Sequence, residues 1–205
     1  MVTGNSAHSG SGASNGDALI CFARGTMIST PNGERRVEHL VEGDMVLTLD
    51  NGVQPIRWTG SRTVRASGAL APVRFLRGTI GNDRDLLVSP QHRMLLSSQF
   101  APGRFDREQV LAPARALVDD FRVSVIYGGM VSYHHIMFDR HQVVIANGAP
   151  SESFHPGGFG LDTLEAHALE SLFKVFPDLR ADTGAYGPVS RPCLNENETR
   201  RLATG

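Results

Sequence analysis

Cys21 is the residue whose type and position most directly suggest a reaction. It follows the first apolar stretch of the chain, Ala18-Leu19-Ile20, and residues 1–17 before that stretch are almost wholly Gly, Ser, Asn and other small residues. Because such a segment buries too little apolar surface to offset its ordering entropy, we expect a flexible leader over residues 1–20. A thiol at this boundary can attack the carbonyl carbon of Ile20 and exchange the Ile20–Cys21 amide for a thioester, since a small fraction of an unperturbed cysteine is thiolate at neutral pH.

Ser89 and His92 are the residues that could assist such a reaction. The leaving group is the α-nitrogen of Cys21, which departs only when it is protonated. His92 is the natural general acid, a role worth about 10²–10⁴-fold in rate, and Ser89 is placed to hydrogen-bond the peptide that breaks. Taken singly, His92 fits a hydrogen-bonded structural histidine and Ser89-Pro90 fits a turn, so both assignments depend on the rest of the sequence.

Three further histidines, His134, His135 and His141, lie close together in the sequence. Successive side chains of a β-strand point to opposite faces, so at most one of His134 and His135 can enter a common site. A tetrahedral zinc site requires convergent ligands, which this divergence opposes. We therefore expect no metal and no other cofactor.

The two cysteines, Cys21 and Cys193, are far apart in the chain and form no CxxC pair. This pattern excludes a disulfide framework and a cysteine-rich zinc site. A single disulfide between them would require Cα atoms within about 7 Å of each other. The alternative is a tail cysteine without a partner.

Charge and composition narrow the classes of partner. Lys and Arg number 20 against 21 Asp and Glu, for a net charge of -1, whereas a nucleic-acid-binding protein usually gathers a basic excess on one face. No apolar run approaches the roughly 18 residues that span a bilayer, and the N-terminus lacks the basic and apolar regions of a signal peptide. We expect a monomer with no nucleic-acid or membrane partner, cytoplasmic by default, with secretion as part of a larger protein as the alternative.

Turn signals about every ten residues indicate an all-β domain over residues 21–155. Pro31-Asn32-Gly33, Glu42-Gly43-Asp44 and Asp50-Asn51-Gly52 are such turns, and Gly128-Gly129 has the form of a hairpin turn between two strands. The segments with strand character are 26–30, 45–49, 56–59, 73–76, 86–88, 94–96, 121–127, 131–138 and 142–146.

The periodicity changes after Gly148. Leu161, Leu164, Ala168, Leu172 and Val175 recur at helical spacing until Pro177 ends the run, which predicts one amphipathic helix over 161–176. We expect residues 156–205 to form this helix, packed on the β-domain, followed by an irregular tail that contains Cys193.

Three blocks of this sequence resemble the Hedgehog/intein (Hint) family of self-processing domains. Residues 21–49 (CFARGTMIST…VEHLVEGDMVLTL) are similar to the first splicing block of inteins and to the start of the Hedgehog autoprocessing domain. Residues 87–93 (LVSPQHR) look like the TxxH block of the family with Ser in place of Thr, and residues 133–148 (YHHIMFDRHQVVIANG) resemble its late block. The blocks occur in family order and spacing, and residues 146–153 (ANGAPSES) are most similar to bacterial Hint domains.

The resemblance implies a horseshoe of short strands and a catalytic set of Cys21, Ser89, His92 and His141, with His141 as the second polar group around the thioester. It places His134 where inteins often carry an Asp, so His134 and Asn147 are supporting candidates. Inteins end in His-Asn, whereas more than fifty residues follow Asn147 here, and residues 58–62 lack the carboxylate with which Hedgehog domains activate a sterol. Neither full splicing nor sterol transfer is therefore expected.

These features predict one autocatalytic cleavage before Cys21. The substrate is the protein's own N-terminal flank up to Ile20, and water or a small nucleophile resolves the thioester. The alternative is a Hint scaffold that has lost turnover and serves as a binding or structural module. A cysteine hydrolase that acts on other molecules fits less well, because its nucleophile belongs on a strand-to-helix turn and not at the entry to the domain.

Overall fold

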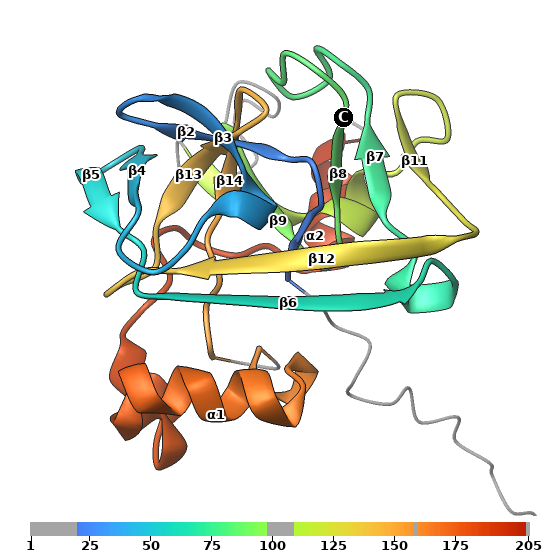
Figure 1. Ribbon diagram of the computed structural model, residues 1–205. Coiled ribbons are helices and arrows are strands. Elements are labelled where there is room, and N and C mark those ends of the chain that lie inside the picture. Colours follow the sequence, from blue (N-terminus) through green and yellow to red (C-terminus); the bar gives the residue numbers. More distant parts are fainter. Residues whose placement is uncertain (1–19, 98–108, 158–159, 204–205) are drawn as a thin grey trace, which may run out of the picture.

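Short β-strands make up most of the structure, a computed structural model that describes residues 20–97, 109–157 and 160–203 (Figure 1). All of the expected leader except Ile20 lies outside these ranges. The strands are β1 (Phe22–Ala23), β2 (Met27–Thr30), β3 (Gly33–Arg36), β4 (Met45–Thr48), β5 (Gly52–Pro55), β6 (Trp58–Arg65), β7 (Val73–Phe75), β8 (Leu86–Val88), β9 (Arg93–Ser97), β10 (Gln109–Pro113), β11 (Val123–Val125), β12 (Met130–Met137), β13 (Val143–Ala146) and β14 (Ala149–Glu152). The prediction of an all-β domain is confirmed.

The strands form two sheets whose neighbouring strands run antiparallel. One sheet has the order β11-β7-β8-β1-β12-β6, and the other has the order β10-β9-β14-β13-β2-β3, with β4 joined to β13 and β5 to β4. Tight turns connect neighbours where glycine permits a positive φ, at Gly33 (φ 98) between β2 and β3 and at Gly52 (φ 62) between β4 and β5. Both turns fall where the sequence signals predicted them.

The main hydrophobic core combines side chains from both sheets. Phe22 and Ile136 come from the first sheet, Ile28 and Val144 from the second, and all four are almost fully buried. Burial of such a side chain contributes about 1.5–3 kcal/mol. Phe22 therefore anchors the start of the folded region, and Cys21, one residue earlier, points to the other face of its strand.

Strand β12 is the element that brings His135 to Cys21. It pairs with β6 over eight residues, from Met130 opposite Arg65 to Met137 opposite Trp58. Its other edge pairs with β1, with Phe22 opposite His134 and Ala23 opposite Tyr133. Strand alternation then directs Cys21, Tyr133 and His135 to one face of the sheet and His134 to the other.

The hairpin expected across Gly128-Gly129 is not formed. Both glycines have a positive φ, as turn residues do, but β11 pairs with β7, whereas β12 pairs with β6 and β1. The Gly128 amide donates to the Ala66 carbonyl and the Ala66 amide donates to the Gly129 carbonyl, so this turn closes the end of the β6–β12 pair. The prediction was wrong because a glycine turn sets a chain reversal without selecting the partner of each flanking strand.

The C-terminal region contains two α-helices, not one helix and an irregular tail. Helix α1 (Ala166–Val175) is the core of the predicted helix, which is preceded by a separate 3₁₀ turn, Leu161–Thr163. Helix α2 (Glu196–Ala203) was missed. Its start is a reciprocal cap in which the Asn195 side chain accepts from the Glu198 amide (2.9 Å) and the Glu198 carboxylate accepts from the Asn195 amide (2.7 Å), and this four-residue pattern is visible in the sequence.

Helix α1 covers one face of the β6–β12 pair and lies below both strands in Figure 1. Its buried Ala168 and Leu172 belong to a second hydrophobic core that also contains Trp58, Met137 and Phe154. This is the face that carries His135. Among the described residues no helix has the length and apolar character needed to cross a membrane.

Candidate active site

The peptide bond between Ile20 and Cys21 is held at both ends by side chains. The Cys21 amide donates to Ser89 Oγ at 2.8 Å, and the Ile20 carbonyl lies 2.9 Å from Nδ1 of His135. Because a carbonyl oxygen can only accept, Nδ1 of His135 carries the proton in this arrangement. The Ser89 amide in turn donates to the Cys21 carbonyl at 3.0 Å, which fixes the turn after β8 against β1.

The Cys21 thiol is buried beside the same histidine. Its Sγ lies 3.3 Å from Nε2 and 3.5 Å from Nδ1 of His135. Since Nδ1 donates to the carbonyl, Nε2 is the nitrogen with a free lone pair for the thiol proton. Burial raises the pKa of Cys21 well above its usual value, while a hydrogen bond from Ser89 and the positive charge of Arg62 act in the opposite direction. The thiol is therefore protonated at neutral pH and needs a base.

His135 is a neutral imidazole in this environment. Burial lowers its pKa to about 4, and the hydrogen bond to the Ile20 carbonyl opposes this shift. The ring packs edge-on against Phe154, with centroids 4.9 Å apart, and lies 6.0 Å from the Trp58 ring. A neutral histidine with one N–H and one lone pair can donate to the carbonyl and accept from the thiol at the same time.

His92 is buried close to the start of β1, but the Cys21 amide donates its hydrogen bond to Ser89 and not to His92. Its ring packs edge-on against Phe22, with centroids 4.5 Å apart. Neither ring nitrogen has a hydrogen-bond partner among the described residues. Burial lowers its pKa to about 4, although the Glu152 carboxylate acts to raise it. His92 is thus neutral at pH 7.

His141 belongs to a different cluster from Cys21. Its Nδ1 accepts from the Ser190 amide at 3.0 Å, and its Nε2 lies 3.1 Å from the Ser153 carbonyl and 3.6 Å from a Glu152 oxygen. The Glu152 carboxylate also accepts from the Arg93 amide at 2.8 Å. These contacts connect β9, β14 and the C-terminal tail, and none of them involves Cys21.

The two supporting candidates lie apart from the thiol. His134 occupies the opposite face of β12, where burial lowers its pKa and the Glu38 charge opposes the shift. Asn147 has φ 47 in the turn between β13 and β14; its side-chain oxygen accepts from the Met27 amide (2.7 Å) and its amide group donates to the Asp85 carbonyl (2.8 Å). These two hydrogen bonds give Asn147 a structural role in joining neighbouring segments.

Cys21 and Cys193 are both free in the structure, Cys21 buried and Cys193 exposed. The backbone of Cys193 pairs with that of Leu111 in β10, which belongs to the second sheet. Cys21, by contrast, precedes β1 in the first sheet. Among the described residues, no group of three or more His, Cys, Asp or Glu side chains is arranged to hold a metal ion.

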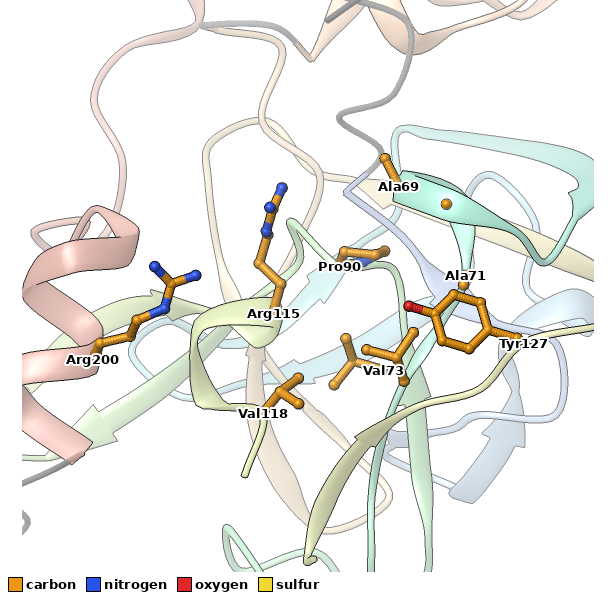
Figure 2. Close-up of a pocket in the computed structure, with 10 residues that line it drawn as sticks. Ala69, Ala71, Val73, Pro90, Arg115, Val118, Tyr127 and Arg200 are labelled. Atoms are coloured by element: carbon orange, nitrogen blue, oxygen red, sulfur yellow. The ribbon is translucent and has the colours of Figure 1, made fainter. Parts of the chain in front are cut away.

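Two of the cavities among the described residues bear on the location of the site. A cavity of about 360 Å³ between β6, α1 and residues 37–41 is lined by His134, His135 and His167 and so reaches the candidate site. A second cavity of about 450 Å³ has apolar walls and two arginines at one end, Arg115 and Arg200 (Figure 2). Both guanidinium groups contact the Glu196 carboxylate at 3.1 Å, and the side chains around Cys21 do not line this second cavity.

His135 is the site residue that the sequence argument did not select. Alternation along β12 indicated that one of His134 and His135 enters the site, but the late-block resemblance pointed to His141 instead. The missing information is the register between β1 and β12, which places His135, and not His134, beside Cys21. Trp58 and Arg62 were also missed as neighbours of the site.

Comparison with models of known protein families identifies the class of protein to which the chain belongs. The family model described as the Hint domain matches residues 20–158. The chain therefore belongs to the Hint domain family, a family of self-processing domains, and the resemblance noted in the sequence is confirmed.

Several solved structures are similar to this chain. A bacterial intein-like domain from Clostridium thermocellum is 13% identical, covering 65% of this chain and 98% of that one, with a TM-score of 0.45. The gp41-1 intein is 9% identical, covering 64% and 96%, with a TM-score of 0.40. A splice-inactive variant of the AceL NrdHF class 3 split intein is 17% identical, covering 65% and 96%, with a TM-score of 0.41. No curated protein matches the sequence.

Proposed function

We propose that this Hint domain cleaves its own chain before Cys21 by an N–S acyl shift. One observation carries the proposal: the thiol, the scissile carbonyl and the scissile nitrogen are all held by two side chains, His135 and Ser89. The substrate is the chain's own N-terminal flank, which ends at Ile20. Cysteine is suited to this step because its sulfur is a strong nucleophile once deprotonated.

In the first step, Nε2 of His135 takes the thiol proton as Sγ attacks the Ile20 carbonyl carbon. The carbonyl oxygen becomes an oxyanion, and it already accepts from Nδ1 at 2.9 Å. Protonation of Nε2 makes the ring an imidazolium, whose Nδ1–H is a stronger donor than that of the neutral ring. Removal of one oxyanion donor in other enzymes costs about 10²–10³-fold in rate, so a single side chain would serve as base and as oxyanion donor.

In the second step, the C–N bond breaks and the Cys21 nitrogen must gain a proton. Ser89 Oγ is 2.8 Å from this nitrogen, and both Ser89 and His135 contact the sulfur. The Ser89 hydroxyl can therefore give its proton to the nitrogen and regain one from the His135 imidazolium, which took it from the thiol in the first step. The proton that leaves sulfur ends on the amine, and the products are a thioester and a free α-amine. His92, in the same turn, is proposed to support this transfer by packing the turn against Phe22, because it is neutral at pH 7 and its ring nitrogens have no partner among the described residues.

Water or a small nucleophile then resolves the thioester. The cavity lined by His135 is the route that the described residues offer to it. We propose neither splicing nor sterol transfer. Asn147 is engaged by Met27 and Asp85, and residues 58–62, the stretch that corresponds to the sterol-activating carboxylate of Hedgehog domains, contain no Asp or Glu.

Burial supports a second candidate function, that of a Hint scaffold without turnover. Cys21 is only 1% exposed and burial raises its pKa. In addition, Sγ is almost equidistant from the two ring nitrogens, so a small ring rotation is needed before Nε2 lines up with the S–H bond.

A time course of intact masses distinguishes the two functions. The purified wild-type chain should yield a fragment that begins at Cys21, whereas Cys21→Ala should remain whole under the same conditions. A wild-type chain that stays whole for days with added thiol would support the inactive scaffold. Cleavage in Cys21→Ala would exclude the mechanism.

A further inference from the structure

Two aromatic rings hold His135 from the side of the second hydrophobic core. Phe154 lies edge-on to the imidazole at 4.9 Å, Trp58 lies at 6.0 Å, and the two aromatic rings are 5.6 Å apart. Gly60 is opposite His135 on β6, and a Cβ there would lie 2.4 Å from the Trp58 ring. The indole is therefore packed directly against the strand position that faces the catalytic histidine.

Helix α1 fixes this indole. The Trp58 Nε1–H donates to Ser171 Oγ at 2.9 Å, and Leu172, which is fully buried, belongs to the same core as Trp58 and Phe154. Neither Ser171 nor Leu172 lies in residues 20–158, the part of the chain that matches the Hint family. The support of His135 thus comes from a C-terminal addition to the family domain.

The segment just before α1 holds the second group that acts on the thiol. Arg62, whose charge favours the Cys21 thiolate, lies 3.4 Å from the Glu165 carboxylate and donates to the Thr163 carbonyl at 3.5 Å. These two contacts fix the position of the Arg62 guanidinium group and of its charge. Residues 161–175 therefore contact the neighbours of both His135 and Cys21.

We propose that the C-terminal segment 161–175 is a positioning element of the self-cleavage site, in which α1 holds Trp58 against His135 and the turn before α1 holds Arg62. The inference rests on the proposed function of Cys21 and assigns its control to residues beyond the family domain. Without the helix, the rings around His135 lose their support and water reaches the imidazole. Placement of reacting groups to within about 1 Å governs rates strongly, so cleavage would slow even though no reacting atom is changed.

Entry of water into this core would also change the pKa of His135. Burial lowers the pKa of His135 to about 4, and water entering the core would relieve that effect and raise the pKa towards its ordinary value of about 6.5. The titratable and charged groups around His135 are Cys21 just before β1, His134 on β12, His92 in the turn after β8, Arg62 on β6, and Glu38 and His167 across the shared cavity.

The test is an NMR titration of His135 in a chain that also carries Cys21→Ala and so stays whole. Leu172→Ala should raise the pKa of His135 by about one unit or more through hydration. Lys174→Ala, at an exposed position of the same helix, should leave it unchanged. In chains that keep Cys21, Leu172→Ala should slow cleavage about tenfold or more and move the acid limb of the rate–pH profile upwards, a shift that simple loss of folded protein does not produce.

Ser171→Ala provides a second variant in case Leu172→Ala does not fold, because it removes the Trp58 acceptor without opening the core. It should raise the pKa of His135 in the same direction by a smaller amount. If the pKa of His135 in Leu172→Ala or in Ser171→Ala is the same as in Lys174→Ala, the proposal is overturned. A wild-type chain that never cleaves would refute the proposed function. The titration requires no cleavage, so the pKa of His135 in the variants would still decide whether α1 positions this histidine.

Discussion

Cys21, Ser89 and His135 act on three different atoms in the proposed reaction, so their replacements should fail in different ways. Cys21 supplies the sulfur, Ser89 contacts the nitrogen that leaves, and His135 contacts both the sulfur and the carbonyl oxygen. His141, by contrast, contacts Ser153, Glu152 and Ser190. The two histidines therefore differ in the step that they can influence.

Replacement of His135 should slow cleavage far more than replacement of His141. His135→Ala removes the base for the thiol and the donor to the Ile20 carbonyl, so we expect a loss of at least the 10²–10⁴-fold that a general base is worth. His141→Ala should mainly lower stability, because it leaves the Ser190 amide and Glu152 without their partner. The measurement is the rate of appearance of the Cys21 fragment in each variant, with circular dichroism to confirm folding.

His135→Gln is the matched control that separates the two proposed functions of His135, base for the thiol and hydrogen-bond donor to the Ile20 carbonyl. A glutamine amide can still donate to the Ile20 carbonyl but cannot accept the thiol proton at neutral pH. Its rate should lie between those of wild type and His135→Ala. If His135→Ala cleaves at the wild-type rate while folded His141→Ala does not cleave, the base has been assigned to the wrong histidine.

The sequence could identify Cys21 and the Ser89–His92 turn because their evidence is local. Cys21 stands where a leader of small residues meets the first strand, and the turn lies in a recognisable block. The choice among His134, His135 and His141 required knowledge of which residue of β12 faces β1. That register depends on pairings between segments more than a hundred residues apart, which no local pattern contains.

Among the secondary-structure elements, the turn at Asn147-Gly148 shows how a family position can serve folding. Asn147 has φ 47, and its side chain bonds to the residue that begins β2 and to the one that precedes β8. It thereby connects β13, β2 and the start of β8. In inteins an asparagine in the late block takes part in the chemistry, whereas here it joins strands.

Asn147→Ala should therefore lower stability and spare the reaction. The variant loses two part-buried hydrogen bonds to backbone groups, and alanine tolerates a positive φ poorly, so we expect the free energy of unfolding to fall by about 2–4 kcal/mol. The rate of cleavage per folded molecule, from urea unfolding curves and mass time courses together, should change less than threefold. A folded Asn147→Ala chain that does not cleave would give Asn147 a catalytic role.

The bounds of the helices and strands were predictable where a recognisable turn or an apolar period marks them. Gly33 and Gly52 marked real turns, and apolar periodicity marked most of α1. The order of strands in the sheets was not predictable, as the absence of a β11–β12 hairpin shows, because sheet order is decided by long-range packing. Helix α2 was missed because its apolar periodicity is weak and its start depends on the Asn195–Glu198 cap.

For the whole molecule, two neutral histidines buried in the folded chain make stability depend on pH. Burial lowers the pKa of both His92 and His135 to about 4, below the value of about 6.5 expected in the unfolded chain. As pH falls below about 6.5 the unfolded state binds protons first, so the stability present above this pH is lost progressively until about pH 4. The direction is opposite to that of a histidine stabilised in its charged form.

We expect the free energy of unfolding to fall by about 2 kcal/mol for each of these histidines between pH 7 and pH 5. The measurement is urea unfolding at both pH values, in Cys21→Ala so that cleavage does not interfere. His92→Gln in this background should reduce the loss by about 2 kcal/mol, the contribution of His92. A stability that is equal at pH 7 and pH 5 would mean that both imidazoles are accessible to water.

The central claim is that the Ile20 carbonyl moves from the nitrogen to the sulfur of Cys21, and trapping the thioester tests it most directly. Hydroxylamine converts a thioester to a hydroxamate and leaves an ordinary amide intact on the same timescale. The purified wild-type chain, treated at neutral pH and analysed by mass spectrometry, should give an upstream fragment that ends in the hydroxamate of Ile20 and a downstream fragment that begins with an unmodified Cys21. A chain that remains whole, or that is cut equally in Cys21→Ala, would contradict the claim.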